Sequence, residues 1–291
     1  IYIRVGRYRD AVLANQHAVR IDQEYLNHPH EESIYTLAYI PHNHHFLWAA
    51  AIKTGQKTLA AKAAEETASL VDKKMMRKPG FNATLQHFYI LPLYTAALFG
   101  DWDAILKEPA PETDLVYPTG IWHYARGLAF LRKGQPEKAK AEMDKLQKTI
   151  SNPAIDELNI FDLNPVREIL QIAAEVLSGE YEAQKKEYDK AISHLNRAIV
   201  LEDNLNYTEP KDWYLPPRQV LGAILLKAGK YADAERVYRK DLEKHPQNGW
   251  SLYGLIQSLK MQKKDNDAET VRKQFDLVWA DADVELTNSH F

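Results

Sequence analysis

Hydrophobic residues recur at helical spacing along most of the chain, in blocks that polar turns separate. In each block a turn is followed by an aromatic residue or proline, an acidic residue, an alanine and then apolar residues three or four positions apart. That spacing places the apolar side chains on one face of a helix. The pattern therefore predicts a series of amphipathic helices. Its clearest examples begin at Gly6, Gly134, Glu187 and Gly229.

The blocks form a repeat. Two intervals between equivalent alanine positions are 34 residues long, and the others are longer. A period of about 34 residues is typical of the helix-turn-helix tetratricopeptide repeat (TPR). The sequence predicts an all-α fold, a right-handed TPR superhelix (α-solenoid) of about six and a half repeats with inserted loops, as a single solenoid over residues 1–291. The equivalent positions are Ala11, Ala60, Ile105, Ala139, Ala191, Ala234 and Ala268.

Glycine supports the register, because Gly127 and Gly222 each lie seven residues before a turn glycine. In a TPR a small residue at this position allows the two helices of the repeat to approach closely.

Pro92 should kink the first helix of the third repeat, and the second helix of that repeat should end early, at residues 108–111. The expected insertions between repeats are residues 25–35, 73–81, 151–163 and 204–217.

The two ends of the chain depart from the repeat. Residues 1–22 resemble only the second helix of a repeat, so the apolar side chains of Ile3, Tyr8 and Val12 should lack their usual partner. We expect either that residues upstream are missing or that a second chain covers this half repeat by self-association. Residues 280–291 are a tail with no repeat pattern.

The composition argues against several classes of function. Lys and Arg number 37 against 40 Asp and Glu, so the net charge of −3 gives no strong positive field for nucleic acid. No apolar run approaches the length of a membrane span. The chain has no cysteine, which excludes disulfides, thiol nucleophiles and thiolate metal sites. Cytoplasm and periplasm both fit, because no targeting segment is visible. The eleven histidines are the unusual feature.

Histidines gather in a first polar segment, residues 42–46. His42 and His45 lie three residues apart on one helical face that lines the predicted groove, where both could reach one metal ion. Asn43, between them, is a candidate ligand contact. The alternative is that these histidines are polar or stacking residues with no ligand. A complete metal site would need a third ligand from another repeat.

A second polar segment is residues 122–127. His123 and Arg126 occupy positions where the repeat expects apolar side chains, so each needs a partner. Either a carboxylate from a neighbouring helix satisfies them, or Arg126 holds an anionic ligand while His123 binds a metal. Tyr124 is a further candidate ligand contact.

The third polar segment is residues 209–218, an inserted loop stiffened by three prolines. It carries Glu209 as a metal-ligand candidate, with Trp213, Tyr214 and Arg218 as candidate ligand contacts. The alternative is that the two aromatic residues are hydrophobic plugs and that Arg218 pairs with a local acid.

At these three segments the sequence resembles a family of bacterial tetratricopeptide-repeat proteins that largely lack an assigned function. The likeness covers HNxHFL at 42–47, FGxWDxIL…PAP at 99–111, WHYARG at 122–127 and EPxxWYxPxRQxLG at 209–222. The resemblance implies a further segment on the N-terminal side. It implies no reaction or substrate.

Two functional hypotheses follow. The first is a non-catalytic scaffold whose concave groove recognises a peptide or partner protein, since no HExxH, GxSxG, GxGxxG or Walker A motif is present. The second is a metal- or small-ligand site inside the solenoid, with enzymatic chemistry left open. It takes a divalent transition metal on His42, His45, His123 and Glu209, with Arg126 or Arg218 orienting an anionic group.

Overall fold

Within the part of the chain that the structure describes, the fold is all-helical apart from one short strand pair. The computed structural model describes residues 1–28 and 33–290. No helix in these ranges is long and apolar enough to cross a membrane. The principal helices are α1 (Tyr8–Leu26), α2 (Ile40–Lys53), α3 (Lys57–Ser69), α4 (Asn82–Tyr89), α5 (Leu91–Leu98), α6 (Trp102–Lys107), α7 (Val116–Arg132), α8 (Pro136–Ile150), α9 (Val166–Gln184), α10 (Tyr188–Asn204), α11 (Pro217–Lys227), α12 (Tyr231–Lys244), α13 (Gly249–Met261) and α14 (Asp265–Val278).

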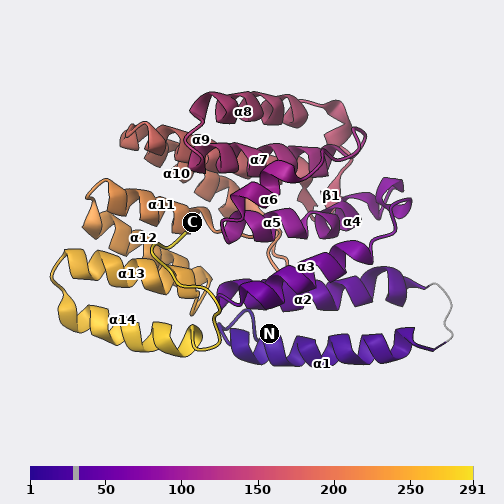
Figure 1. The fold of residues 1–291 in the computed structure, drawn as a ribbon, viewed down its shortest axis with the longest axis horizontal. Helices are drawn as coiled ribbons and strands as arrows, with labels where there is room; N and C mark the ends of the chain where they lie inside the picture. The colour runs from indigo at the N-terminus through magenta and orange to yellow at the C-terminus, as the bar shows by residue number, and fades with distance from the viewer. Residues whose placement is uncertain (29–32, 291) are drawn as a thin grey trace.

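Consecutive helices pack in pairs and the pairs stack on one another (Figure 1). All seven positions used to align the repeat, from Ala11 to Ala268, are at most 2% exposed. The alanine is buried because it faces the neighbouring helix, and the apolar residues that follow at helical spacing complete that face. The sequence register therefore identified the packed face of each helix.

The predicted irregularities in the third helix pair are present. Its first helix is divided into α4 and α5 around Ile90, two residues before Pro92. Its second helix, α6, has only six residues. Two predicted insertions contain 3₁₀ turns, Met75–Arg77 and Pro153–Ile155. The π-helical turn Tyr35–Tyr39 extends past the first predicted insertion. The antiparallel pair β1 (Asn159–Ile160) and β2 (Asn164–Pro165), in which Ile160 pairs with Asn164, extends past the third.

Only one of the two glycines behaves as the repeat predicts. Gly222 in α11 lies against the Tyr238 ring of α12, its partner helix. Gly127 in α7 instead lies against Leu177 of α9, which belongs to the next pair. The small residue at position 127 therefore allows neighbouring pairs to approach.

The two ends of the helical array meet. The Trp250 indole of α13 donates a hydrogen bond to the Ile52 carbonyl of α2 at 2.7 Å. The Trp279 ring, at the end of α14, lies directly over Gly55 in the turn between α2 and α3. Asp283 accepts hydrogen bonds from the first backbone N–H groups of α3, at Lys57 (2.5 Å) and Thr58 (2.9 Å). The contacts form a seam that joins α13, α14 and the segment after them to α2 and α3 (Figure 1).

Residues 1–22 are covered within this chain more fully than the sequence predicts. Helix α1 begins at Tyr8 and packs on α2, and both Tyr8 and Val12 are buried. Tyr8 shares a cavity with His245, at the end of α12. Two of the three side chains expected to lack a partner are therefore covered within this chain. Self-association through this segment stays a prediction.

Residues 280–290 contain no helix, as the tail prediction requires, but they are not a free tail. Figure 1 shows the segment running from α14 across the array toward α11. Ser289 is fully buried, and its backbone carbonyl accepts a hydrogen bond from Gln219 at 2.8 Å. The Tyr238 and Ser289 hydroxyls lie 2.6 Å apart. This segment therefore occupies part of the inner face of the array.

Candidate functional site

Aromatic side chains fill the inner face beside that segment. Trp213 and Tyr214, on the loop between α10 and α11, are both buried. The Tyr214 ring stacks on Tyr94 with 4.2 Å between centroids, and its hydroxyl lies 3.4 Å from that of Tyr124. Three predicted ligand contacts, Tyr124, Trp213 and Tyr214, thus contribute to the packed interior. For Trp213 and Tyr214 this packing corresponds to the hydrophobic plug, the alternative interpretation of the third polar segment.

Arg218 is held by local carboxylates. Its guanidinium donates to both oxygens of Asp203, at 2.9 and 2.5 Å, and lies 3.3 Å from Glu202. A guanidinium that already forms a bidentate pair has few donors left for a ligand. Burial raises the pKa of Glu202 to about 7 despite this neighbour.

His123 and Arg126 share one carboxylate, Glu142 of α8. His123 Nδ1 lies 2.6 Å from the Glu142 carboxylate and Arg126 Nε lies 3.7 Å from it. The Arg126 guanidinium also stacks over the Trp122 ring at 4.4 Å. The structure supplies the neighbouring carboxylate that the alternative interpretation of this segment expects.

The four metal-ligand candidates do not converge. His45 is fully buried beside Trp48 and His87, and burial lowers its pKa well below the usual value. His42 lies apart from His45, in a groove that it shares with Glu209; Glu209 also lines the cavity described below. Across residues 1–28 and 33–290, no group of three or more His, Asp or Glu side chains is placed to hold a metal ion. Asn43 donates a hydrogen bond to the buried Asp22 carboxylate at 2.8 Å, so it has a structural partner.

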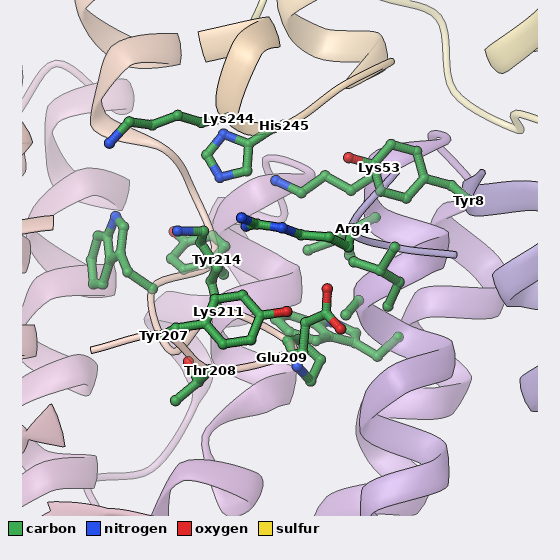
Figure 2. A pocket seen from close by; sticks show the side chains of 16 residues that line it. Arg4, Tyr8, Lys53, Tyr207, Thr208, Glu209, Lys211, Tyr214, Lys244 and His245 are labelled. Carbon is green, nitrogen blue, oxygen red and sulfur yellow. The ribbon is translucent and has the colours of Figure 1, made fainter. Parts of the chain in front are cut away.

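A cavity of about 50 Å³ lies where the N-terminal segment, the end of α2, the 207–214 loop and the end of α12 meet (Figure 2). That volume accommodates about three or four water-sized groups. Its apolar walls include the rings of Tyr8, Trp48, Trp213 and Tyr214. Its cationic side chains come from four different segments and are Arg4, Lys53, Lys211 and Lys244.

These four cations differ in their partners. Lys244 is paired with Asp203, and Arg4 stacks over the Tyr207 ring at 5.0 Å. Lys53 and Lys211 form no ion pair with any carboxylate that the structure describes. In Figure 2 the Arg4 and Lys53 side chains extend toward the centre of the cavity, with His245 above them. The cavity therefore presents four cationic side chains against one carboxylate, that of Glu209.

Burial dominates the electrostatics of Lys53 and His245. It lowers the pKa of Lys53 to about 8; Lys211 adds to that effect, and Asp241 and Glu202 oppose it. His245 Nδ1 lies 2.9 Å from the Asp241 carboxylate, and burial lowers the pKa of His245 despite that neighbour. Burial alone would raise the pKa of Asp241, but His245 and the Ser251 hydroxyl bring it down to about 2. Asp241 is therefore a carboxylate that orients the His245 ring.

Sequence reasoning missed most of this site. Lys53 lies in the last turn of α2, where a lysine ordinarily faces water and complements the helix dipole. Lys244 occupies the same kind of position in α12. Sequence reasoning did single out Glu209, Trp213 and Tyr214, which line the cavity, but not Lys211, which lies between them in the third polar segment. The arrangement can bind a small anion, because unpaired cations in a partly desolvated cavity attract negative charge more strongly than exposed ones.

Comparisons with known proteins add no identification. No protein-family model matches this chain. No curated protein matches it either. The likeness to bacterial tetratricopeptide-repeat proteins therefore stays a prediction, and the case for function depends on the residues of the site.

Proposed function

We propose that this chain is a tetratricopeptide-repeat binding protein whose right-handed superhelix is closed by the seam between its ends, and that its ligand is a small anion held in the cavity of Lys53. The 34-residue intervals and the buried alanine register support the repeat assignment. A groove open to a partner protein is less well supported, because the loop with Trp213 and Tyr214 and the segment 280–290 both lie on the inner face.

One observation carries the ligand proposal: the Lys53 ammonium lies in a cavity with a second unpaired lysine, Lys211, and no carboxylate of the described chain pairs with either. Two like charges in a desolvated space raise the free energy of the empty protein. An anion between them removes that repulsion. Because Arg4 extends into the same cavity, a dianion would gain a third charged contact.

Calorimetric titration with oxalate tests this proposal. We expect saturable binding that weakens as salt is added, and a loss of about tenfold or more in affinity for Lys53→Met, since a charge-assisted hydrogen bond is worth about 1.5–3 kcal/mol. Lys273→Met is the matched control, because Lys273 is an exposed lysine on α14 without an ion pair among the described residues. Equal affinity in the wild-type protein and Lys53→Met would refute the proposal, as would no binding at millimolar oxalate.

A second candidate function has one observation in its favour. The inner face already holds an extended chain, residues 280–290. The Gln219 side chain donates a hydrogen bond to the Ser289 carbonyl of that chain, and the Gln257 side chain donates one to the Thr287 carbonyl. A superhelix that holds its own segment in this way could hold a peptide of similar character. The test is hydrogen exchange of residues 284–290 with a peptide of that sequence added in excess. Faster exchange would indicate displacement, and unchanged exchange at saturating peptide would exclude this function.

A further inference from the structure

We propose that Lys53 is a nucleophile and that its amine forms a Schiff base with the carbonyl group of a small α-oxo acid. This inference depends on the proposed anion site and specifies its ligand as a molecule with a carboxylate next to an aldehyde or ketone. Three features carry it: the partly buried position of Lys53 among apolar walls, a carboxylate–histidine pair at the same cavity, and the placement of the remaining cations.

The position of the amine is the first feature. Lys53 is the last residue of α2, and the seam fixes the backbone next to it, because the Ile52 carbonyl accepts the Trp250 hydrogen bond. The side chain extends into a cavity whose walls include Trp48 and Tyr8. Apolar walls and an absent ion pair are the conditions under which a lysine amine loses its proton near neutral pH and becomes a nucleophile.

The charged groups around Lys53 come from every element that packs against the cavity. Arg4 belongs to the N-terminal segment, and the uncharged but titratable Tyr8 belongs to α1. Glu209 and Lys211 lie on the loop, and Glu202 lies on α10. Asp241 and Lys244 lie on α12, and His245 follows it directly. Asp241 and Glu202 favour the ammonium form of Lys53, whereas burial and Lys211 favour the free amine. The balance keeps the pKa of Lys53 near 8, so a useful fraction of free amine exists at pH 7.

His245 is the second feature. Its Nδ1 faces the Asp241 carboxylate at 2.9 Å, and Asp241 is itself fixed by the Ser251 hydroxyl at 2.6 Å and the Asn248 amide at 3.2 Å. A proton on Nδ1 leaves Nε2 as the ring position that exchanges protons. Figure 2 shows the His245 ring and the Lys53 amine side by side at the cavity, and the charge of Lys53 lowers the pKa of His245. His245 is therefore placed to act as the acid and base for the amine.

The reaction balances as follows. The lone pair of the Lys53 amine attacks the carbonyl carbon, so that a nitrogen–carbon bond forms and the carbonyl oxygen takes up a proton. The carbon–oxygen bond then breaks and the oxygen leaves as water, with one hydrogen from the amine and one proton delivered through His245. The product is a protonated imine, which keeps the single positive charge. No oxidant or further reactant is consumed.

The remaining cations are the third feature. With Lys244 occupied by Asp203, the carboxylate of the α-oxo acid would be held by Lys211 and Arg4. Both face the same cavity as Lys53, so the carboxylate and the carbonyl carbon of one small molecule would reach their partners together. The small volume of the cavity favours acids of two or three carbons.

The test is reductive trapping with glyoxylate and sodium cyanoborohydride at pH 7, followed by peptide mass spectrometry. Reduction of the imine converts Lys53 into carboxymethyl-lysine, which is stable and can be located. Lys53 has a pKa near 8 against an ordinary value of 10.5. Its larger fraction of free amine should therefore make trapping at least about tenfold faster than at the exposed Lys273, even after allowance for its lower basicity.

Two further measurements make the result specific. Oxalate, which has no reactive carbonyl, should protect Lys53 and leave Lys273 unprotected, and this comparison requires no mutant protein. His245→Gln should slow trapping at Lys53 and change its dependence on pH, because the group that transfers the proton is lost. Trapping spread evenly over the surface lysines, or trapping at Lys53 that oxalate does not reduce, overturns the inference. If oxalate binds by calorimetry while glyoxylate gives no preference for Lys53, the anion site stands and the nucleophile does not.

Discussion

Replacing Lys53 by methionine should make the folded protein more stable at neutral pH. The pKa of Lys53 is about 8 in the folded protein against 10.5 for an ordinary lysine, so folding disfavours the ammonium form. A displacement of this size corresponds to about 3 kcal/mol when Lys53 is protonated in both the folded and the unfolded state. Methionine has a similar length and no charge, so Lys53→Met should recover most of that free energy at pH 7.

The sign of the pH dependence is fixed by the same values. Below pH 8 the ammonium is present in both states and the whole destabilisation applies. Between pH 8 and 10.5 the folded protein loses its proton first, so the destabilisation declines, and above 10.5 it is absent. The advantage of Lys53→Met should therefore fall to less than half, on the order of 1 kcal/mol, at pH 9.5.

Urea unfolding of the wild-type protein and Lys53→Met, at pH 7 and at pH 9.5, measures both quantities. The difference between the two proteins at each pH cancels the titration of all other groups. Lys273→Met should change the free energy of unfolding by less than about 0.5 kcal/mol at either pH, because surface substitutions have small effects. A Lys53→Met protein that is less stable than wild type at pH 7, or whose advantage does not decline at pH 9.5, would refute the electrostatic account of the cavity.

Three further predictions concern the contacts that close and fill the array. Gly55→Ala should lower the free energy of unfolding in urea by more than about 2 kcal/mol, because the new methyl group meets the Trp279 ring and the backbone has a φ of +69°. Gly134→Ala is the control, since Gly134 has a φ of +68° but open space around it; it should cost only about 1 kcal/mol. Asp283→Ala should cost about 1 kcal/mol by the same assay, because two N–H groups at the start of α3 lose their acceptor; an unchanged midpoint would contradict the seam. Glu180→Gln should cost about 3 kcal/mol at pH 7 and speed hydrogen exchange in residues 284–290. The cost should begin to decline as pH falls below the ordinary glutamate pKa of 4.5, and an equal cost at pH 3 would refute the ion pair.

Glu180 responds in this way because of what surrounds it. It is buried and lies 3.1 Å from the Arg132 guanidinium, and it also pairs with His290 of the C-terminal segment. Burial alone would raise the pKa of Glu180, but the charges of Arg132 and His290 bring it well below the ordinary value. A carboxylate with a depressed pKa stabilises the folded state above its unfolded pKa and loses that effect as it is protonated.

The repeat could be read from the sequence because its signals are local. An alanine such as Ala139 or Ala234 is buried by the helix next to it, so the spacing along the chain is enough to identify the face. Pro92 acts within its own helix, and the division between α4 and α5 follows from the chemistry of one residue. Such features need no knowledge of the rest of the molecule.

The cavity could not be predicted in the same way. Lys53 and Lys211 lie far apart in the sequence, and each alone looks like an ordinary surface lysine. Trp213 attracted attention as an aromatic residue in a polar loop, yet it is 2% exposed and belongs to the interior. The difference arises because the inner face is filled by segments outside the repeat pattern, and helical periodicity carries no information about where those segments lie.

The seam and the cavity are adjacent, and this arrangement accounts for how an unfavourable charge is kept. Lys53 is two residues from Gly55 and one from Ile52, so the residues that carry the seam contacts of Trp279 and Trp250 flank the lysine. A charge that opposes folding survives only where neighbouring contacts offset it. Buried indole packing supplies that stabilisation at the same turn of chain. A protein that needed only to close its array would gain stability from an apolar side chain at position 53. The proposed anion site therefore gives Lys53 a role that the contacts of the fold alone do not require.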